Sequence, residues 1–213
     1  MKKGWWEEYA KVYDRIICFS SLYNELLDMA ANTLSLEGRI LEVGCGTGNL
    51  LSRLNDGKNR VLYGIDSSPD MLRLAEEKVP DTRLFEGDAA KLPFREAFFD
   101  GVVCLNVLYA VKNPQKVIDE AYRVLKHNGV YVVSGPKPNQ NFSLLVNSLR
   151  KDVDGRVSED ELFLFIEINK RLIENAQLYE NKDVVEMLES AGFSVTLNSS
   201  AYLGQAYFVV AQK

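Results

Sequence analysis

The sequence is poor in histidine, and this scarcity limits the chemistry that the chain can carry out. His127 is the one histidine in 213 residues, so no histidine acid–base pair or histidine metal site can be assembled. The acidic residues are scattered and lack the ligand spacing of a metal site. We therefore expect no bound metal, and we expect His127, in the turn His-Asn-Gly, to be structural.

Cysteine and long apolar runs are also scarce. Cys18, Cys45 and Cys104 form no CxxC pair, and their odd number gives no disulfide framework, which indicates a reducing compartment. No apolar run approaches the roughly 20 residues of a membrane span. Glu7 and Glu8 interrupt the segment after the first lysines, so we expect no signal peptide. Together these absences predict a cytoplasmic protein.

The chain has no excess of basic residues. Lys and Arg number 25 against 30 Asp and Glu, for a net charge of −5. Nucleic-acid binding requires a dense Lys/Arg face, so a nucleic-acid partner is disfavoured. The length of 213 residues, with 46% hydrophobic and 26% charged residues, is typical of one globular domain with a substantial core.

Between residues 39 and 134, strand patterns alternate with helix patterns. We expect strands at 39–43, 60–65, 82–86, 99–105 and 130–134, with helices at 49–54, 68–78 and 114–125. Such alternation predicts βαβ units and a parallel sheet. Right-handed crossovers then give a doubly wound α/β fold.

The flanking segments are different in character. Residues 5–36 and 141–178 have helical periodicity, 183–191 is a further helix, and strands at 193–198 and 205–212 are expected to form a hairpin. We therefore expect a single domain, 1–213. Its parts are a helical N-terminal cap (1–37), a cofactor-binding core (38–136), a helical insertion or lid (137–180), and a closing helix with hairpin (181–213).

A glycine-rich turn, LEVGCGTGNL at 41–50, follows the first predicted strand. In a doubly wound sheet, ligands bind at this edge, and glycines let a ligand approach the backbone. Gly44, Gly46 and Gly48 alternate, whereas a dinucleotide site has GxGxxG. Asn49 occupies the place of the last glycine, and no Gly-Lys-Ser/Thr follows, which excludes a P-loop.

Three acids follow three successive predicted strands or end them. Glu42, just before the glycines, would repel a phosphate but suits an ammonium group. Asp66 lies about 20 residues beyond the loop, where a carboxylate binds ribose hydroxyls. Asp88 could accept from an adenine amino group, with the Ala89 amide as a donor. S-adenosylmethionine carries an ammonium and a sulfonium but no phosphate, so it fits these acids. The alternatives are a Glu42 that faces solvent or pairs with a neighbouring base, a helix-capping Asp66, and a simple Gly-Asp turn at Asp88.

Five motifs, in order, carry a family resemblance over residues 38–135: ILEVGCGTGNL, GIDSSPDML, EGDAAKLPF, FDGVVCLNVLYAV and EAYRVLKHNGVYVVS. They resemble the class I S-adenosylmethionine-dependent methyltransferases, particularly the small-molecule group with the ubiquinone and menaquinone enzymes. The resemblance implies a Rossmann-like, seven-stranded, mostly parallel sheet with a reversed last strand. It also implies S-adenosylmethionine as cofactor and S-adenosylhomocysteine as product.

The same resemblance implies a cofactor site. In this site, Glu42 and the glycine loop hold the methionine part of the cofactor, and Asp66 binds the ribose. The residues that follow Asp66, together with Asp88, surround the adenine. The end of the fourth strand lines the methyl end, and Tyr13 covers the cofactor. The residues are Tyr13, Glu42, Gly44, Cys45, Gly46, Gly48, Asp66, Ser67, Met71, Asp88, Ala89, Leu105 and Asn106. Two departures are Tyr109-Ala110, where the family commonly has histidine, and His127-Asn128-Gly129 in place of Pro-Gly-Gly.

The predicted reaction is methyl transfer to an O, N or C nucleophile, of a small molecule, by in-line displacement. The catalytic base is unassigned; Tyr9, Tyr13, Tyr109 and the acids of 152–167 are candidates. Substrate choice is expected at the N-terminal helix and the 137–180 insertion, which has apolar residues (Phe142, Leu144, Leu145, Phe163, Phe165, Ile166) that could line a pocket or simply pack.

Three other functions stay open. Asn-Val-Leu-Tyr at 106–109 is similar to the Asn/Asp-Pro-Pro-Tyr motif of enzymes that methylate amino groups of proteins or nucleic acids, but it lacks both prolines. The other two are a non-catalytic, regulatory S-adenosylmethionine-binding module and a dehydrogenase.

Overall fold

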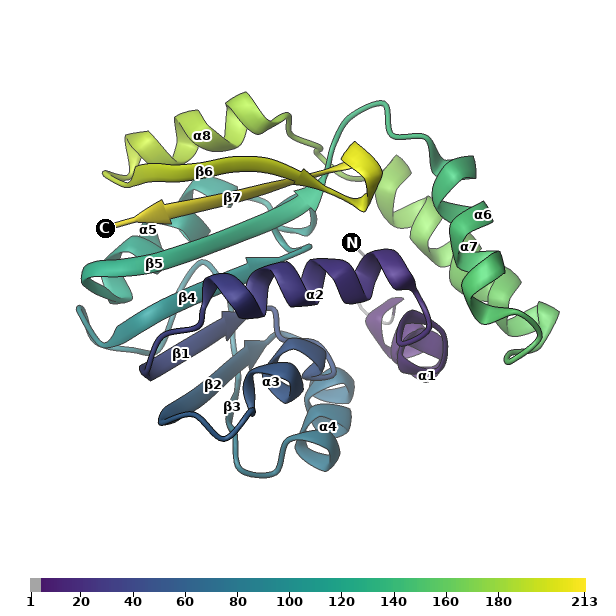
Figure 1. The fold of residues 1–213 in the computed structure, drawn as a ribbon, viewed down its shortest axis with the longest axis horizontal. Coiled ribbons are helices and arrows are strands. Elements are labelled where there is room, and N and C mark those ends of the chain that lie inside the picture. Colours follow the sequence, from purple (N-terminus) through teal and green to yellow (C-terminus); the bar gives the residue numbers. More distant parts are fainter. Residues whose placement is uncertain (1–4) are drawn as a thin grey trace.

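The computed structural model describes residues 5–213, and its core has the predicted βαβ alternation (Figure 1). The strands of this part are β1 (Gly38–Val43), β2 (Arg60–Asp66), β3 (Arg83–Glu86), β4 (Phe99–Leu105) and β5 (Leu125–Pro136). The helices between them are α3 (Asn49–Leu54), α4 (Pro69–Lys78) and α5 (Pro114–Val124), with a short helix η1 (Leu108–Ala110) after β4. Strand and helix positions therefore agree with the sequence periodicity to within a few residues, apart from the start of β5.

The sheet has seven strands in the order β3-β2-β1-β4-β5-β7-β6. Strands β1 to β5 are parallel, whereas β7 (Ala206–Gln212) runs antiparallel to β5. Strand β6 (Ser194–Ala201) pairs antiparallel with β7, and the short helix η2 (Tyr202–Gly204) connects the two strands. The predicted closing hairpin and the reversed last strand are thus confirmed.

Helices cover both faces of the sheet. Helices α5 and α8 (Asn181–Ser190) bury Val117, Ile118, Val184 and Leu188 against one face. On the other face, α2 (Ser21–Thr33), α3 and α4 pack a second apolar cluster, and α2 crosses this face in Figure 1. Because both faces are covered, the central strands are apolar along nearly their whole length.

The remaining helices lie beyond the carboxyl ends of the parallel strands (Figure 1). They are α1 (Trp5–Ile17), α6 (Phe142–Val153) and α7 (Glu159–Glu174), and a third apolar cluster joins them to Met71 of α4. An ion pair of 2.7 Å between Arg15 and Glu161 ties α1 to α7. The N-terminal helix and the insertion, distant in sequence, therefore pack as one cap, which we call the helical cap.

The predicted helix at 5–36 is interrupted. Helix α1 ends at Ile17 and α2 begins at Ser21, because the Ser20 hydroxyl accepts the Tyr23 amide as an N-cap. No helix within residues 5–213 is long and apolar enough to cross a membrane.

The prediction for His127-Asn128-Gly129 is wrong in one respect. The turn was expected to separate the helix from a strand starting at Val130, but β5 already begins at Leu125, which pairs with Phe99. The next pair is Gly101 with Val130, so residues 126–129 bulge out of the strand. Asn128 adopts a positive φ of 65°, which asparagine tolerates better than most residues. His127 is exposed on this bulge, far from the carboxyl ends of the strands.

Candidate functional site

A cavity of about 350 Å³ lies between the carboxyl ends of the strands and the helical cap. Twelve of the thirteen predicted cofactor residues line it: Tyr13, Glu42, Gly44, Cys45, Gly46, Asp66, Ser67, Met71, Asp88, Ala89, Leu105 and Asn106. Gly48 does not; it is instead the left-handed N-cap of α3, with φ 77°. The fold therefore brings the predicted residues together from four strand ends and α1.

The glycine loop is shaped by backbone demands. The Gly44 amide donates to the Ile65 carbonyl at 2.7 Å, and the Gly46 amide donates to Asp66 Oδ2 at 2.8 Å. A Cβ on Gly44 would lie 2.3 Å from Val107 Cγ2, whereas a Cβ on Gly46, which has φ 52°, would meet no atom within 4 Å. Gly44 is thus required by packing, and Gly46 leaves an open space where a ligand can approach the backbone.

Glu42 is buried beneath this loop rather than facing solvent, with 5% of its surface exposed. Its Oε2 has no hydrogen-bond partner among the described residues. Burial, and then the charge of Asp66, raise the pKa of Glu42 well above its ordinary value. A buried acceptor without a donor is costly, and the ammonium group of an amino-acid ligand would supply that donor.

Asp66 joins β2 to the glycine loop. Its Oδ2 accepts the Gly46 amide, and its Oδ1 accepts the Ser68 amide at 2.9 Å. Ser68, whose hydroxyl accepts the Met71 amide, caps α4, so Asp66 is not the N-cap. Burial raises the pKa of Asp66, and its backbone hydrogen bonds act in the opposite direction. Each carboxylate oxygen keeps acceptor capacity, as two ribose hydroxyls require.

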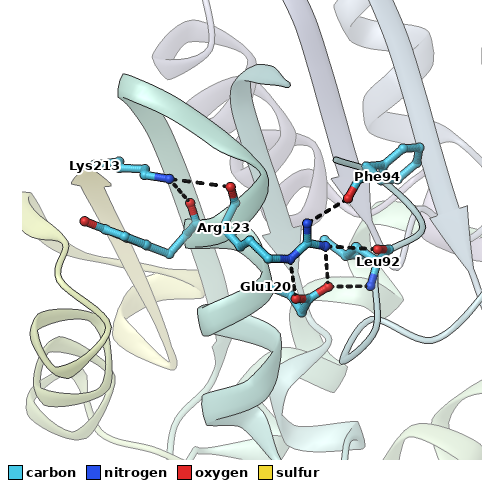
Figure 2. Close-up of polar contacts among 6 residues, drawn as sticks. Leu92, Phe94, Glu120, Arg123 and Lys213 are labelled. Atoms are coloured by element: carbon cyan, nitrogen blue, oxygen red, sulfur yellow. Dashed lines mark hydrogen bonds and ion pairs between the residues drawn. The ribbon is translucent and has the colours of Figure 1, made fainter. Parts of the chain in front are cut away.

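Asp88 lies on the loop after β3, where its Oδ1 accepts the Ala90 amide at 2.9 Å. Figure 2 shows how α5 fixes the continuation of this loop. Glu120 accepts the Leu92 amide at 2.7 Å, while Arg123 donates to the carbonyls of Leu92 and Phe94 and to Glu120. Glu120 and Arg123 belong to the motif EAYRVLKHNGVYVVS, but the sequence pattern alone assigns neither residue a role.

A second contact was also missed by sequence reasoning. Asp14 of α1 accepts from the Thr47 hydroxyl and from Asn49 Nδ2 at 3.2 Å, and it pairs with Lys78 Nζ at 2.6 Å. Lys78 also donates to Asn49 Oδ1. The residue that replaces the third glycine of a dinucleotide loop therefore takes part in a network that holds the helical cap against the loop. We call Asp14, Thr47, Asn49 and Lys78 the clasp.

The cavity lining is rich in tyrosine. We call Tyr9, Tyr13, Tyr23, Tyr109 and Tyr202 the tyrosine cluster; all line the cavity. Burial raises the pKa of every one of these hydroxyls, that of Tyr109 to about 12. The three tyrosines that are candidate bases therefore stay protonated near neutral pH: Tyr9, Tyr13 and Tyr109. The acids of 152–167 do not line the cavity.

Two residues of the cavity lining, one of them a member of this cluster, have strained backbones. Asn106 has φ 57° and Tyr202 has φ 50°, and both residues line the cavity. Non-glycine residues at positive φ are uncommon and concentrate at ligand sites. Of the apolar insertion residues, Phe142, Leu145, Phe165 and Ile166 line the cavity, whereas Leu144 does not and Phe163 is 62% exposed.

Comparison with known proteins agrees with this geometry. Residues 41–133 match the model of a methyltransferase domain family. An uncharacterized protein of Methanocaldococcus jannaschii is 27% identical over 88% of this chain and 80% of its own length. The 2-methyl-6-phytyl-1,4-hydroquinone methyltransferase of spinach is 35% identical, over 59% of this chain and 38% of that enzyme. The chain thus spans about two fifths of the plant enzyme that it matches.

Among solved structures, the magnesium protoporphyrin IX methyltransferase of Synechocystis, with bound S-adenosylmethionine, superposes with a TM-score of 0.63. It is 18% identical and covers 90% of this chain and 80% of that one, which shows a shared fold. Fold, motifs and acidic cavity together define a class of enzyme that uses S-adenosylmethionine. The match over residues 41–133 and the shared fold support a class I S-adenosylmethionine-dependent methyltransferase domain that uses S-adenosylmethionine as its cofactor.

Proposed function

We propose that this protein transfers the methyl group of S-adenosylmethionine to a small molecule with an apolar body. The observation that carries the proposal is the buried Glu42 beside Asp66 and Asp88, three acids from three strand ends on one cavity. Among the described residues that line this cavity, none is Lys, Arg or His. The cavity therefore disfavours a pyrophosphate, as in NADH, and suits a ligand with cationic groups.

Each part of the cofactor would have its own residues. Glu42, Gly44, Cys45 and Gly46 would hold the methionine end, with Gly48 shaping the loop. Asp66 would bind the ribose hydroxyls, and Ser67, Met71, Asp88 and Ala89 would surround the adenine. Leu105, Asn106 and Tyr13 would border the methyl end. When bound, the cofactor supplies a methyl group on an activated sulfonium. The protein aligns the acceptor with it, and such alignment can contribute roughly 7–11 kcal/mol.

The acceptor is proposed to be a small molecule because the cavity continues from the cofactor residues into the helical cap. Its walls there are aromatic and aliphatic, including Phe142, Leu145 and Phe165. The spinach relative acts on a hydroquinone with a phytyl tail, which is consistent with an apolar acceptor. We propose that residues 137–180 act as a lid over this acceptor. Equal proteolysis of 137–160 with and without cofactor would contradict the lid.

Calorimetry tests the cofactor part of the proposal. S-adenosylhomocysteine should bind in a one-to-one complex, and NADH should not; the reverse would identify a dehydrogenase. The matched variants are Asp66→Asn and Asp81→Asn, since Asp81 lies outside the cavity lining. Only Asp66→Asn should weaken the binding of S-adenosylhomocysteine. A regulatory binding module would bind S-adenosylhomocysteine. It would not convert S-adenosylmethionine to S-adenosylhomocysteine with any acceptor in a broad panel.

A further inference from the structure

The tyrosine cluster gathers five phenol groups from four separate segments of the chain. Tyr9 and Tyr13 come from α1, Tyr23 from α2, Tyr109 from η1 and Tyr202 from η2. Ring centroids lie 4.9 Å apart for Tyr9 and Tyr13 and 6.3 Å apart for Tyr13 and Tyr23. Phe165 of α7 adds a ring 5.6 Å from Tyr9. The proposed acceptor end of the cavity therefore has a cluster of aromatic rings among its aliphatic side chains.

The part of the cavity wall that the structure describes carries no positively charged side chain. The described lining residues include Glu42, Asp66 and Asp88 but no Lys, Arg or His. An anionic acceptor would therefore lose its hydration without gaining a charged partner. Aromatic rings instead attract cations, and they do so most strongly where the cation is desolvated.

The described residues of the same wall offer no general base at the proposed acceptor end. The tyrosine hydroxyls keep their protons near neutral pH, and the three carboxyl groups belong to the proposed cofactor end. Tyr109 has no hydrogen-bond partner among the described residues, so its hydroxyl is available to a ligand. A phenol or carbon acceptor needs a base to become nucleophilic, whereas an uncharged amine has its lone pair ready.

We infer that the tyrosine cluster is the acceptor subsite for an amine with an apolar body. This inference rests on the proposed methyl transfer and specifies its acceptor. The amine lone pair forms the new N–C bond, and the electrons of the broken C–S bond stay on sulfur. The nitrogen thereby becomes positively charged, and a primary or secondary amine then releases one proton to water. Ring faces around the nitrogen stabilise this developing charge, which favours the transition state over the uncharged acceptor.

The experiment compares a cation with its uncharged isostere on the full chain saturated with S-adenosylhomocysteine. Choline and 3,3-dimethylbutan-1-ol have the same shape, so their difference reports the charge. Choline should bind about tenfold more tightly, as expected for desolvated cation–aromatic contacts. Tyr109→Phe, which keeps the ring, should stay within about threefold of wild type for choline. Tyr109→Leu should lose most of the preference for choline, with little change for the alcohol.

The outcomes separate the two proposals. Absence of S-adenosylhomocysteine binding would overturn the proposed function itself. Normal S-adenosylhomocysteine binding with equal affinity for the two probes, tighter binding of the alcohol, or binding of neither would overturn the amine inference alone. Methyl transfer to a 4-alkylphenol but not to an N,N-dimethylalkylamine would do the same. If Tyr109→Leu fails to bind S-adenosylhomocysteine, the comparison of probes on the wild-type chain still decides the question.

Discussion

Asp14 on the first helix and Lys78 at the end of α4 form an ion pair of 2.6 Å, although 64 positions separate them in sequence. Both side chains are about one quarter exposed, and both also bond the glycine loop, through Thr47 and Asn49. The pair therefore connects the helical cap to the loop that the cofactor is expected to occupy. We therefore expect the position of the cap and the order of the loop to be coupled through these four residues.

We predict that Asp14→Ala weakens S-adenosylhomocysteine binding and destabilises the fold by similar, modest amounts. The pair is partly exposed, so its loss should lower the free energy of unfolding by only about 1 kcal/mol. A loop less ordered by a similar amount would bind about fivefold more weakly. Calorimetry and chemical unfolding measure the two effects. Arg73→Ala, which breaks an exposed pair with Glu77, is the control and should change neither. Unchanged binding in Asp14→Ala would contradict the coupling.

A second prediction concerns the pH dependence of stability. The pKa of Glu42 is higher in the folded chain than in the unfolded chain, because burial and Asp66 disfavour its charge. The stabilising contribution of the protonated form is therefore complete below the unfolded pKa and is lost as pH rises through the folded pKa. A difference of one pKa unit between the folded and the unfolded chain corresponds to about 1.4 kcal/mol in the free energy of unfolding.

Glu42→Gln removes this titration. Without ligand, the variant should gain stability over wild type as pH rises from about 5 to 9, while its affinity for S-adenosylhomocysteine falls because the ammonium loses a carboxylate. Urea unfolding at several pH values measures the first effect and calorimetry the second. A stability difference that stays constant with pH would show that Glu42 titrates normally.

A third prediction separates backbone strain from ligand exclusion. Gly46 (φ 52°) and Gly57 (φ 78°) both have positive φ and would both place a Cβ in open space, but only Gly46 lines the cavity. Alanine at either position should cost about 1 kcal/mol of stability through the left-handed backbone. Only Gly46→Ala should also weaken S-adenosylhomocysteine binding, by at least about tenfold. Equal binding losses in the two variants would indicate that strain alone is responsible.

A fourth prediction concerns the support of the Asp88 loop. Arg123→Ala removes donors to the Leu92 and Phe94 carbonyls and leaves Glu120 without its cation (Figure 2). We expect a loss of about 2 kcal/mol in unfolding free energy, together with weaker S-adenosylhomocysteine binding. Thermal and chemical unfolding measure the first quantity. Arg150→Ala, which breaks an exposed pair with Glu159, should be nearly neutral. A neutral Arg123→Ala would show that the loop holds without α5.

Much of the fold could be read from local patterns, and the failures are local as well. The bounds of α3 and β4 were predicted to the residue, because a glycine cap and a continuous apolar run mark them. The bulge at 126–129 was missed, because its pairing with β4 depends on a strand 26 residues earlier. Asn49 was interpreted only as a missing glycine, although in the fold it bonds Asp14 and Lys78.

The sequence by itself determined the βαβ order, the loop after β1 and the three acids at strand ends. These features follow from periodicity, from the positive φ that glycine permits, and from the rule that parallel strands end at one edge. Only the tertiary structure decided what faces those acids. The helical cap, the clasp and the tyrosine cluster join residues from 9 to 202. Contacts of that range depend on packing between whole elements, which no local pattern encodes.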